Sequence, residues 1–128
     1  MYQYNITIDR VIDGDTVVVD IDLGFNINLY KQKVRLHGIN APESRTRDKE
    51  EKFKGLAAKA RLKELLRERE VRLESKEKGK YGRILGELFI KSPVSEKWNN
   101  VNKQLVKEGH AVEYYGGKRW RILCRHIA

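Results

Sequence analysis

The sequence has little of what a disulfide framework, a zinc site or a membrane span requires. Its 128 residues include one cysteine, Cys124, which cannot form an internal disulfide. No cluster of cysteines and histidines has the spacing of a zinc site, and no apolar run is long enough to cross a membrane. Residues 1–5 have neither the basic nor the apolar region of an export signal. We therefore expect a cytoplasmic protein with no membrane partner, whose fold is stabilised by packing alone.

Positive charge is abundant in the chain. Lys and Arg number 27 against 18 Asp and Glu, which gives a net charge of +9. A summed positive field of this kind attracts polyanions, so nucleic acid is the leading class of partner. The same charge would also suit acidic membranes or proteins, so composition indicates a partner class and no chemistry.

Short segments of alternating apolar and polar residues recur along the chain, with the period of half-buried strands. They cover residues 2–9, 17–23, 34–36, 71–74 and 84–90. A chain of 128 residues fits a single domain, so residues 1–128 are expected to fold as one unit. Five strands in this order suit a small, closed antiparallel sheet.

Apolar residues at helical spacing predict three helices. The three sets are Phe53, Leu56, Ala57, Ala60, Leu65 and Leu66; then Trp98, Val101 and Leu105, followed by Gly109 as a helix-ending residue; and last Trp120, Leu123 and Ile127. The first helix falls between the third and fourth strands, as an OB-fold with an inserted helix requires. The predicted fold is therefore α+β and mainly β, a five-stranded OB-fold barrel with about three helices.

Five polar residues together have the chemistry that phosphodiester hydrolysis requires. That reaction needs a hard cation held by oxygen ligands, charge neutralisation on the phosphate, and a group that orients or deprotonates water. Asp13, Asp15 and Glu43 supply carboxylates, and Arg35 and Arg83 can each direct two donors at a phosphate. Taken singly these residues are weak signals, because Asp-Gly-Asp is usually only a hairpin turn and a Pro-Glu pair a solvated loop.

The order of the motifs resembles that of the staphylococcal nuclease family. Asp-Gly-Asp-Thr occupies residues 13–16, Val-Arg-Leu-His-Gly-Ile-Asn-Ala-Pro-Glu residues 34–43, and Lys-Tyr-Gly-Arg residues 80–83, while residues 101–109 resemble the family's penultimate helix. This resemblance covers nearly the whole chain. It implies an OB-fold endonuclease that requires Ca²⁺, cuts DNA or RNA, and leaves 3′-phosphate ends.

The resemblance also implies a role for each matching residue. Asp15 would be the principal calcium-binding carboxylate, with Asn40 and the carbonyl of Ala41 as the other protein ligands and Asp13 as an anion behind them. Glu43 would be the general base, and Arg35 and Arg83 would bind the phosphate and stabilise its five-coordinate transition state. Tyr81 and Tyr115 would line the nucleotide pocket, with Lys49 and Lys80 near neighbouring phosphates.

Asn40 departs from the family pattern, which has aspartate at this position. An amide oxygen can ligate calcium, but the site loses one negative charge, so we expect an active enzyme with weakened metal binding. The alternative is a catalytically weakened OB module that binds single-stranded nucleic acid. The sequence leaves open the preference for DNA or RNA, and we expect a monomer.

Overall fold

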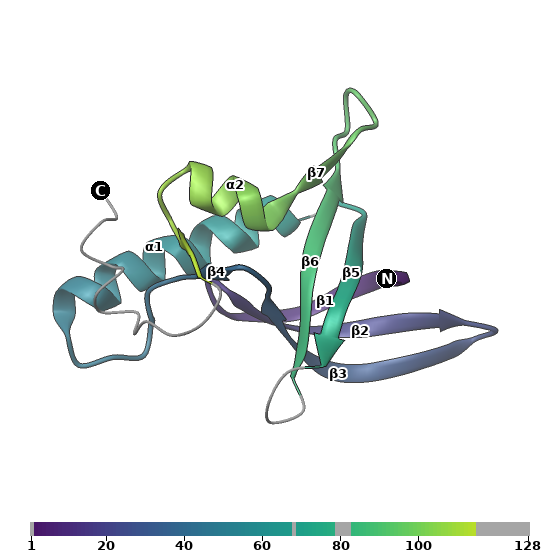
Figure 1. Cartoon of the computed structure of the whole chain (residues 1–128), viewed down its shortest axis with the longest axis horizontal. Helices are drawn as coiled ribbons and strands as arrows, with labels where there is room; N and C mark the ends of the chain where they lie inside the picture. The colour runs from purple at the N-terminus through teal and green to yellow at the C-terminus, as the bar shows by residue number, and fades with distance from the viewer. Residues whose placement is uncertain (1, 68, 79–82, 115–128) are drawn as a thin grey trace.

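The computed structural model describes residues 2–67, 69–78 and 83–114, and the strands of this part of the chain curl around a common core (Figure 1). In chain order the elements are β1 (Tyr2–Asp13), β2 (Thr16–Gly24), β3 (Ile27–Leu36), β4 (Ile39–Asn40), α1 (Lys49–Leu66), β5 (Val71–Lys78), β6 (Ile84–Lys91), β7 (Trp98–Asn100), α2 (Val101–Lys107) and β8 (Val112–Glu113). All five predicted strand segments lie in strands. The terminal helix expected over residues 120–127 lies outside the described residues.

Five of the strands form a closed barrel. Their order is β3-β2-β1-β5-β6, and an additional β3–β6 pairing closes the ring. The β3–β6 pair is parallel, with Arg35 opposite Leu85, whereas the other four pairs in the ring are antiparallel. The prediction of an entirely antiparallel sheet is therefore wrong at the β3–β6 pair, which we call the parallel seam. A closed ring with an odd number of strands cannot alternate direction throughout, so one parallel pair is unavoidable.

The interior of the barrel is filled by branched aliphatic side chains from alternating strand positions. The fully buried set includes Val17, Val19, Val34, Leu36, Leu73 and Leu88, together with Leu62 from α1 and Val101 and Leu105 from α2. Burying a side chain of this size contributes roughly 1.5–3 kcal/mol, so packing alone can hold a fold of this size.

Helix α1 begins where Asp48 caps it and packs against β1. The Asp48 side chain accepts hydrogen bonds from the backbone N–H groups of Glu50 and Glu51. The helix buries Glu51, Gly55, Ala58, Leu62, Leu65 and Leu66. The predicted apolar face is only partly correct, because Phe53 and Leu56 are 76% and 49% exposed. The helix has two apolar stripes, and the one that includes Gly55, Ala58 and Leu62 is buried.

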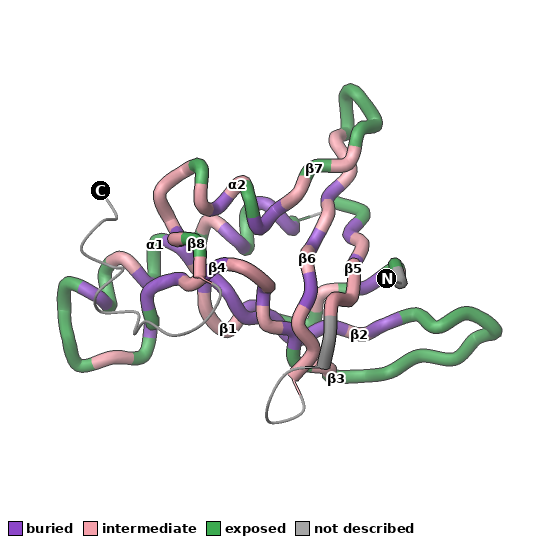
Figure 2. Tube along the Cα trace, in the orientation of Figure 1, coloured by how far each residue is buried: buried purple, intermediate pink, exposed green. Residues whose placement is uncertain are grey.

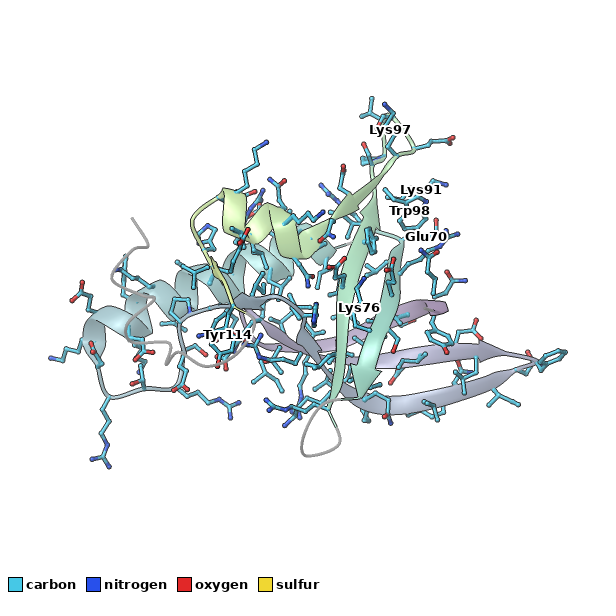
Figure 3. The ribbon with its side chains drawn as sticks, viewed as in Figure 1. Glu70, Lys76, Lys91, Lys97, Trp98 and Tyr114 are labelled. Carbon is cyan, nitrogen blue, oxygen red and sulfur yellow. The ribbon has the colours of Figure 1, made fainter. Side chains whose placement is uncertain are left out.

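Helix α2 begins later than its apolar spacing predicted. Trp98 belongs to β7, and Asn100 caps the helix by accepting a hydrogen bond from the backbone N–H of Lys103. The guanidinium of Arg72 lies 4.3 Å from the centre of the Trp98 ring. Figure 3 shows Trp98 outside the barrel. The prediction of Trp98 as a helix-core residue is therefore wrong. Gly109 ends the helix as predicted, with a φ of 81°.

Beyond the barrel, β2 and β3 continue as a long hairpin whose residues 22–31 are all exposed (Figure 2). Within the described ranges, neither helix is long and apolar enough to cross a membrane.

Candidate active site

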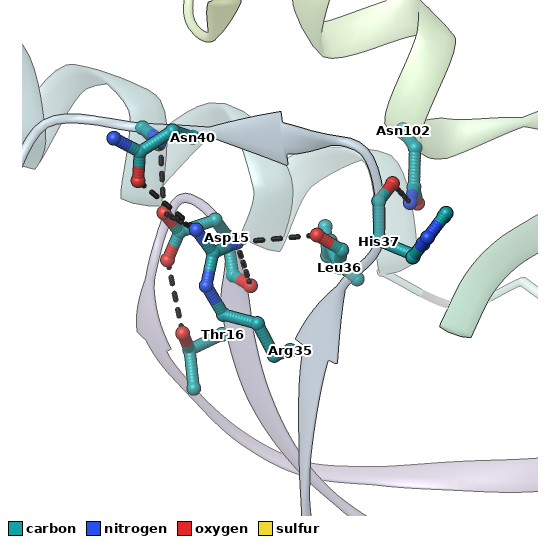
Figure 4. Close-up of polar contacts among 8 residues, drawn as sticks. Asp15, Thr16, Arg35, Leu36, His37, Asn40 and Asn102 are labelled. Atoms are coloured by element: carbon teal, nitrogen blue, oxygen red, sulfur yellow. Dashed lines mark hydrogen bonds and ion pairs between the residues drawn. The ribbon is translucent and has the colours of Figure 1, made fainter. Parts of the chain in front are cut away.

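The turn between β1 and β2 presents Asp15 at the end of the barrel, where the carboxylate is nearly buried. The residue is 7% exposed. Its Oδ1 accepts a hydrogen bond from the Thr16 hydroxyl at 2.9 Å, and its Oδ2 accepts one from the backbone N–H of Ala41 at 2.8 Å (Figure 4). These contacts fix the carboxylate against the start of the loop that follows β4. They also bring together Asp15 and Ala41, two of the three predicted metal ligands.

The guanidinium of Arg35 joins Asp15 to Asn40, the third predicted ligand. Its Nη2 donates to Asn40 Oδ1 at 3.0 Å and lies 3.4 Å from Asp15 Oδ2. Its Nη1 donates to the carbonyl oxygen of Leu36 at 3.1 Å. The side chains of Arg35 and Asp15 are only 16% and 9% exposed, so the ion pair is largely shielded from water. Two side-chain oxygens therefore point at one positively charged nitrogen.

This oxygen geometry fits a hard cation. Carboxylate and amide oxygens are ligands that Ca²⁺ and Mg²⁺ accept, and both groups already converge on one cationic atom. Among the described residues no group of three or more His, Cys, Asp or Glu side chains is arranged to hold a metal. A cation here would thus be held by one carboxylate, one amide and backbone or water oxygens.

The loop that carries Glu43 is held close to both β1 and α1. Asp13 accepts a hydrogen bond from the backbone N–H of Ser44 at 3.1 Å and another from the Ser44 hydroxyl. A Cβ atom added at Gly55 of α1 would lie 2.3 Å from the carbonyl oxygen of Glu43. The backbone of Glu43 is therefore fixed, while its side chain is exposed to solvent. Asp13, predicted as an anion near the metal, contacts this loop.

Arg83 precedes β6, beside the parallel seam of the barrel. Strand alternation places the side chains of Arg83 and Leu85 on the same side of the sheet, and Leu85 is the partner of Arg35. The register therefore brings both predicted phosphate-binding arginines to one face. Arg83 is half-buried.

The predicted substrate-binding residues are only partly described. Lys49 is the first residue of α1 and is exposed, directly after the loop that begins at Glu43. Lys80, Tyr81 and Tyr115 lie outside the described residues. The chain reaches Tyr114 beside β4, where the Tyr114 backbone N–H donates to the carbonyl oxygen of Gly38 at 2.9 Å.

Asn102, which the sequence did not single out, holds the strand ends beneath the site. It is 2% exposed, and its Nδ2 donates to the carbonyl oxygen of His37 at 2.8 Å (Figure 4) and to that of Gly86 at 3.3 Å. Its Oδ1 accepts from the Leu88 N–H at 3.2 Å. Asn102 thus fastens α2 to the parallel seam just beyond Arg35. Only a polar residue in an otherwise apolar helix stripe could have signalled this role.

The fold and the site define an OB-fold barrel with a polar centre of one buried carboxylate, one amide oxygen and two arginines at the barrel end. A sequence profile of the family described as "Staphylococcal nuclease homologue" matches residues 33–121. The chain therefore belongs to the staphylococcal nuclease family.

Individual relatives match over most of this chain. It is 36% identical over 112 residues to a micrococcal nuclease of Shigella flexneri, an alignment that covers 84% of this chain and 58% of that protein. It is 33% identical over 120 residues to a thermonuclease of Staphylococcus intermedius, covering 91% of this chain and 64% of that protein. An endonuclease of Bacillus subtilis, YhcR, is 31% identical over 121 residues, which are 88% of this chain and 9% of that protein. This chain thus spans less than two thirds of the length of each of these relatives.

Proposed function

We propose that this protein is a metal-dependent endonuclease that hydrolyses phosphodiester bonds of DNA, RNA or both. The observation that carries the proposal is the convergence of Asp15 and Asn40 oxygens on the Arg35 guanidinium, with Glu43 on the adjoining loop. Family membership and the nuclease names of the relatives support the same activity.

Each residue has a chemical task in this proposal. Glu43 accepts a proton from the attacking water, whose oxygen bonds to phosphorus while the bond to the 5′-oxygen breaks. The products are a 3′-phosphate and a 5′-hydroxyl, which takes up a proton. Arg35 and Arg83 donate to the phosphate oxygens, where negative charge grows as the five-coordinate transition state forms.

Asp15, Asn40 and the carbonyl of Ala41 would hold the cation, for which we propose Ca²⁺. When bound, the ion supplies Lewis-acid stabilisation of a phosphate oxygen. The three protein ligands carry a single negative charge among them, so we infer weaker cation affinity than a site with two carboxylates would have.

The same charge deficit favours one alternative, a nuclease-like barrel that binds single-stranded nucleic acid and cleaves it slowly or not at all. Its basic surface would attract the polynucleotide through the net charge of +9. Binding of that kind should survive a chelator, whereas cleavage should not.

A cleavage assay separates the two functions. Single-stranded DNA, duplex DNA and RNA are incubated with the protein in Ca²⁺, Mg²⁺ or a chelator, and the product ends are analysed. The proposal expects cleavage that Ca²⁺ supports, that the chelator abolishes and that Glu43→Gln removes, with 3′-phosphate ends. Bound but intact substrate in every metal would establish the binding module instead.

A further inference from the structure

The two arginines of the candidate active site are carried by the two strands of the parallel seam. Arg35 lies within β3, and Arg83 directly precedes β6. Within the described ranges these strands pair only over residues 34–36 and 84–86. Parallel pairs are also slightly less stable per residue than antiparallel ones. A further contact across so short a seam would therefore control where the two guanidinium groups lie.

Asn102 makes such a contact from the first turn of α2. Its Nδ2 donates to the carbonyl oxygen of His37, just after β3 (Figure 4), and to that of Gly86 in β6. Its Oδ1 accepts from the Leu88 N–H, also in β6. The Gly86 carbonyl oxygen accepts a second hydrogen bond from the His37 N–H at 2.8 Å. One side chain is thus hydrogen-bonded to both strands at the end of the seam.

These contacts require an amide in one orientation. Nδ2 has two N–H groups, which match the two carbonyl acceptors, and Oδ1 matches the one N–H donor. Asn102 is 2% exposed, so little water can replace a lost partner. Val101 and Leu105 of the same helix are fully buried and aliphatic, so an aliphatic side chain would satisfy the core. The amide therefore serves the seam.

The peptide group that Asn102 holds lies between residues that orient Arg35. The Leu36 carbonyl oxygen, one residue before His37, accepts from Arg35 Nη1 at 3.1 Å. Asn40, three residues after His37, accepts from Arg35 Nη2 at 3.0 Å. A shift of the His37 carbonyl would therefore move two of the groups that hold the Arg35 guanidinium.

We propose that Asn102 is a positioning residue for phosphodiester cleavage. By holding the two strands of the seam together, it sets the distance between the guanidinium groups of Arg35 and Arg83. Both groups can then reach one phosphate as negative charge grows on it. Asn102 is itself too buried to touch substrate, and it acts through the arginines. This inference rests on the proposed endonuclease activity, and it gives α2 a part in the rate of the reaction.

Single-turnover cleavage by Asn102→Ala tests the proposal, with Val101→Ala as the matched control. Val101 is 0% exposed in the same turn of α2, and its truncation removes core packing but no hydrogen bond of the seam. Rates and KM are measured at a temperature at which circular dichroism shows every variant to be folded. Asn102→Leu is the second variant, because it fills the space of the amide and loses only the hydrogen bonds.

We expect both Asn102 variants to lower the rate at saturating substrate by about tenfold or more and to change KM by less than about threefold. Val101→Ala should keep both quantities within about twofold of the wild type. In the Arg83→Lys background, Asn102→Ala should lower the rate by only about threefold or less, because an arginine through which it acts is already absent.

NMR of the Arg35 Nε–H group gives a measurement that needs no cleavage. Its resonance should shift in Asn102→Ala and Asn102→Leu but not in Val101→Ala. Unchanged Arg35 resonances would overturn the proposal, as would equal rate losses in Asn102→Ala and Val101→Ala, or the same loss in the Arg83→Lys background. A wild type that cleaves no substrate in any metal would refute the endonuclease and any role of Asn102 in its rate. The Arg35 resonance would then still show whether Asn102 fixes the arginine.

Discussion

Replacing the amide nitrogen of the Asn40 side chain by oxygen, as in aspartate, would add one negative charge to the candidate site. Its Oδ1 shares the Arg35 guanidinium with Asp15. Asn40→Asp adds a second carboxylate beside Asp15, so cation affinity should rise, by about tenfold or more, because affinity for hard cations follows ligand charge. Isothermal titration calorimetry with Ca²⁺ measures this without substrate. Unchanged affinity would mean that residue 40 does not ligate the ion.

Glu108 forms an ion pair with Arg61, and the contribution of this pair to the free energy of unfolding depends on pH. The Arg61 guanidinium, which donates to both Glu108 carboxylate oxygens, lowers the pKa of Glu108 from 4.5 to about 2. Because the unfolded chain takes up this proton at higher pH, the stabilisation is complete above about pH 4.5 and is lost as pH falls toward 2. Glu108→Gln should therefore cost on the order of 2 kcal/mol at neutral pH and flatten the acid limb of stability.

Urea unfolding measured between neutral pH and acid, followed by circular dichroism, checks this. Glu64→Gln is the matched control, since Glu64 also pairs with Arg61, at 3.0 Å, but its side chain is 73% exposed. The control should lose about 0.5 kcal/mol or less. Equal losses in the two variants would contradict the account of the Arg61–Glu108 pair.

At the scale of elements, the contact of α1 with the Glu43 loop depends on Gly55. Ala within a helix is favoured over Gly by about 1 kcal/mol, yet a Cβ at Gly55 would meet the Glu43 carbonyl carbon at 2.5 Å and the Ser44 nitrogen at 2.7 Å. Gly55→Ala should keep the helix but shift the loop, lowering the cleavage rate by about tenfold or more.

The control for this prediction is Ala60→Gly, at an exposed position of the same helix. It should lower the free energy of unfolding by about 1 kcal/mol and leave the rate unchanged. Cleavage kinetics and urea unfolding of both variants give the comparison. A Gly55→Ala protein with the wild-type rate would show that the loop position is not fixed by this contact.

The sequence predicts an element best when the spacing of its apolar residues fits only one secondary structure with one buried face. The alternation of Val17, Val19 and Ile21 allows only a strand with a buried face, and the structure confirms it. Helix α1 instead carries two apolar stripes, and the buried one includes Gly55, which lies against the Glu43 loop, and Ala58, which lies against Gly14 of the β1–β2 turn. Trp98 was placed in a helix because spacing does not reveal that Asn100 caps the helix after it.

For the whole molecule, the resemblance predicted particular site residues, whereas the net charge of +9 indicated only a polyanionic partner. Asp15, Arg35, Asn40 and Ala41 contact one another in the structure, and the roles assigned to them stay a prediction. The partners of Asn102 across the parallel seam could not be predicted, because its hydrogen bonds join segments that are distant in sequence. Nor did the strand pattern reveal that the β2–β3 hairpin extends beyond the barrel.

We propose that the two arginines stabilise the transition state of phosphodiester cleavage, and the decisive measurement is the single-turnover cleavage rate of Arg83→Lys. Lysine keeps the net charge and so the long-range attraction for substrate, but loses the two-donor fork. Lys97→Ala, at an exposed residue of the β6–β7 loop (Figure 3), serves as the control for a change in charge. We predict a fall of about tenfold or more for Arg83→Lys and less than about twofold for the control. Cleavage by Arg83→Lys at the wild-type rate would contradict the account.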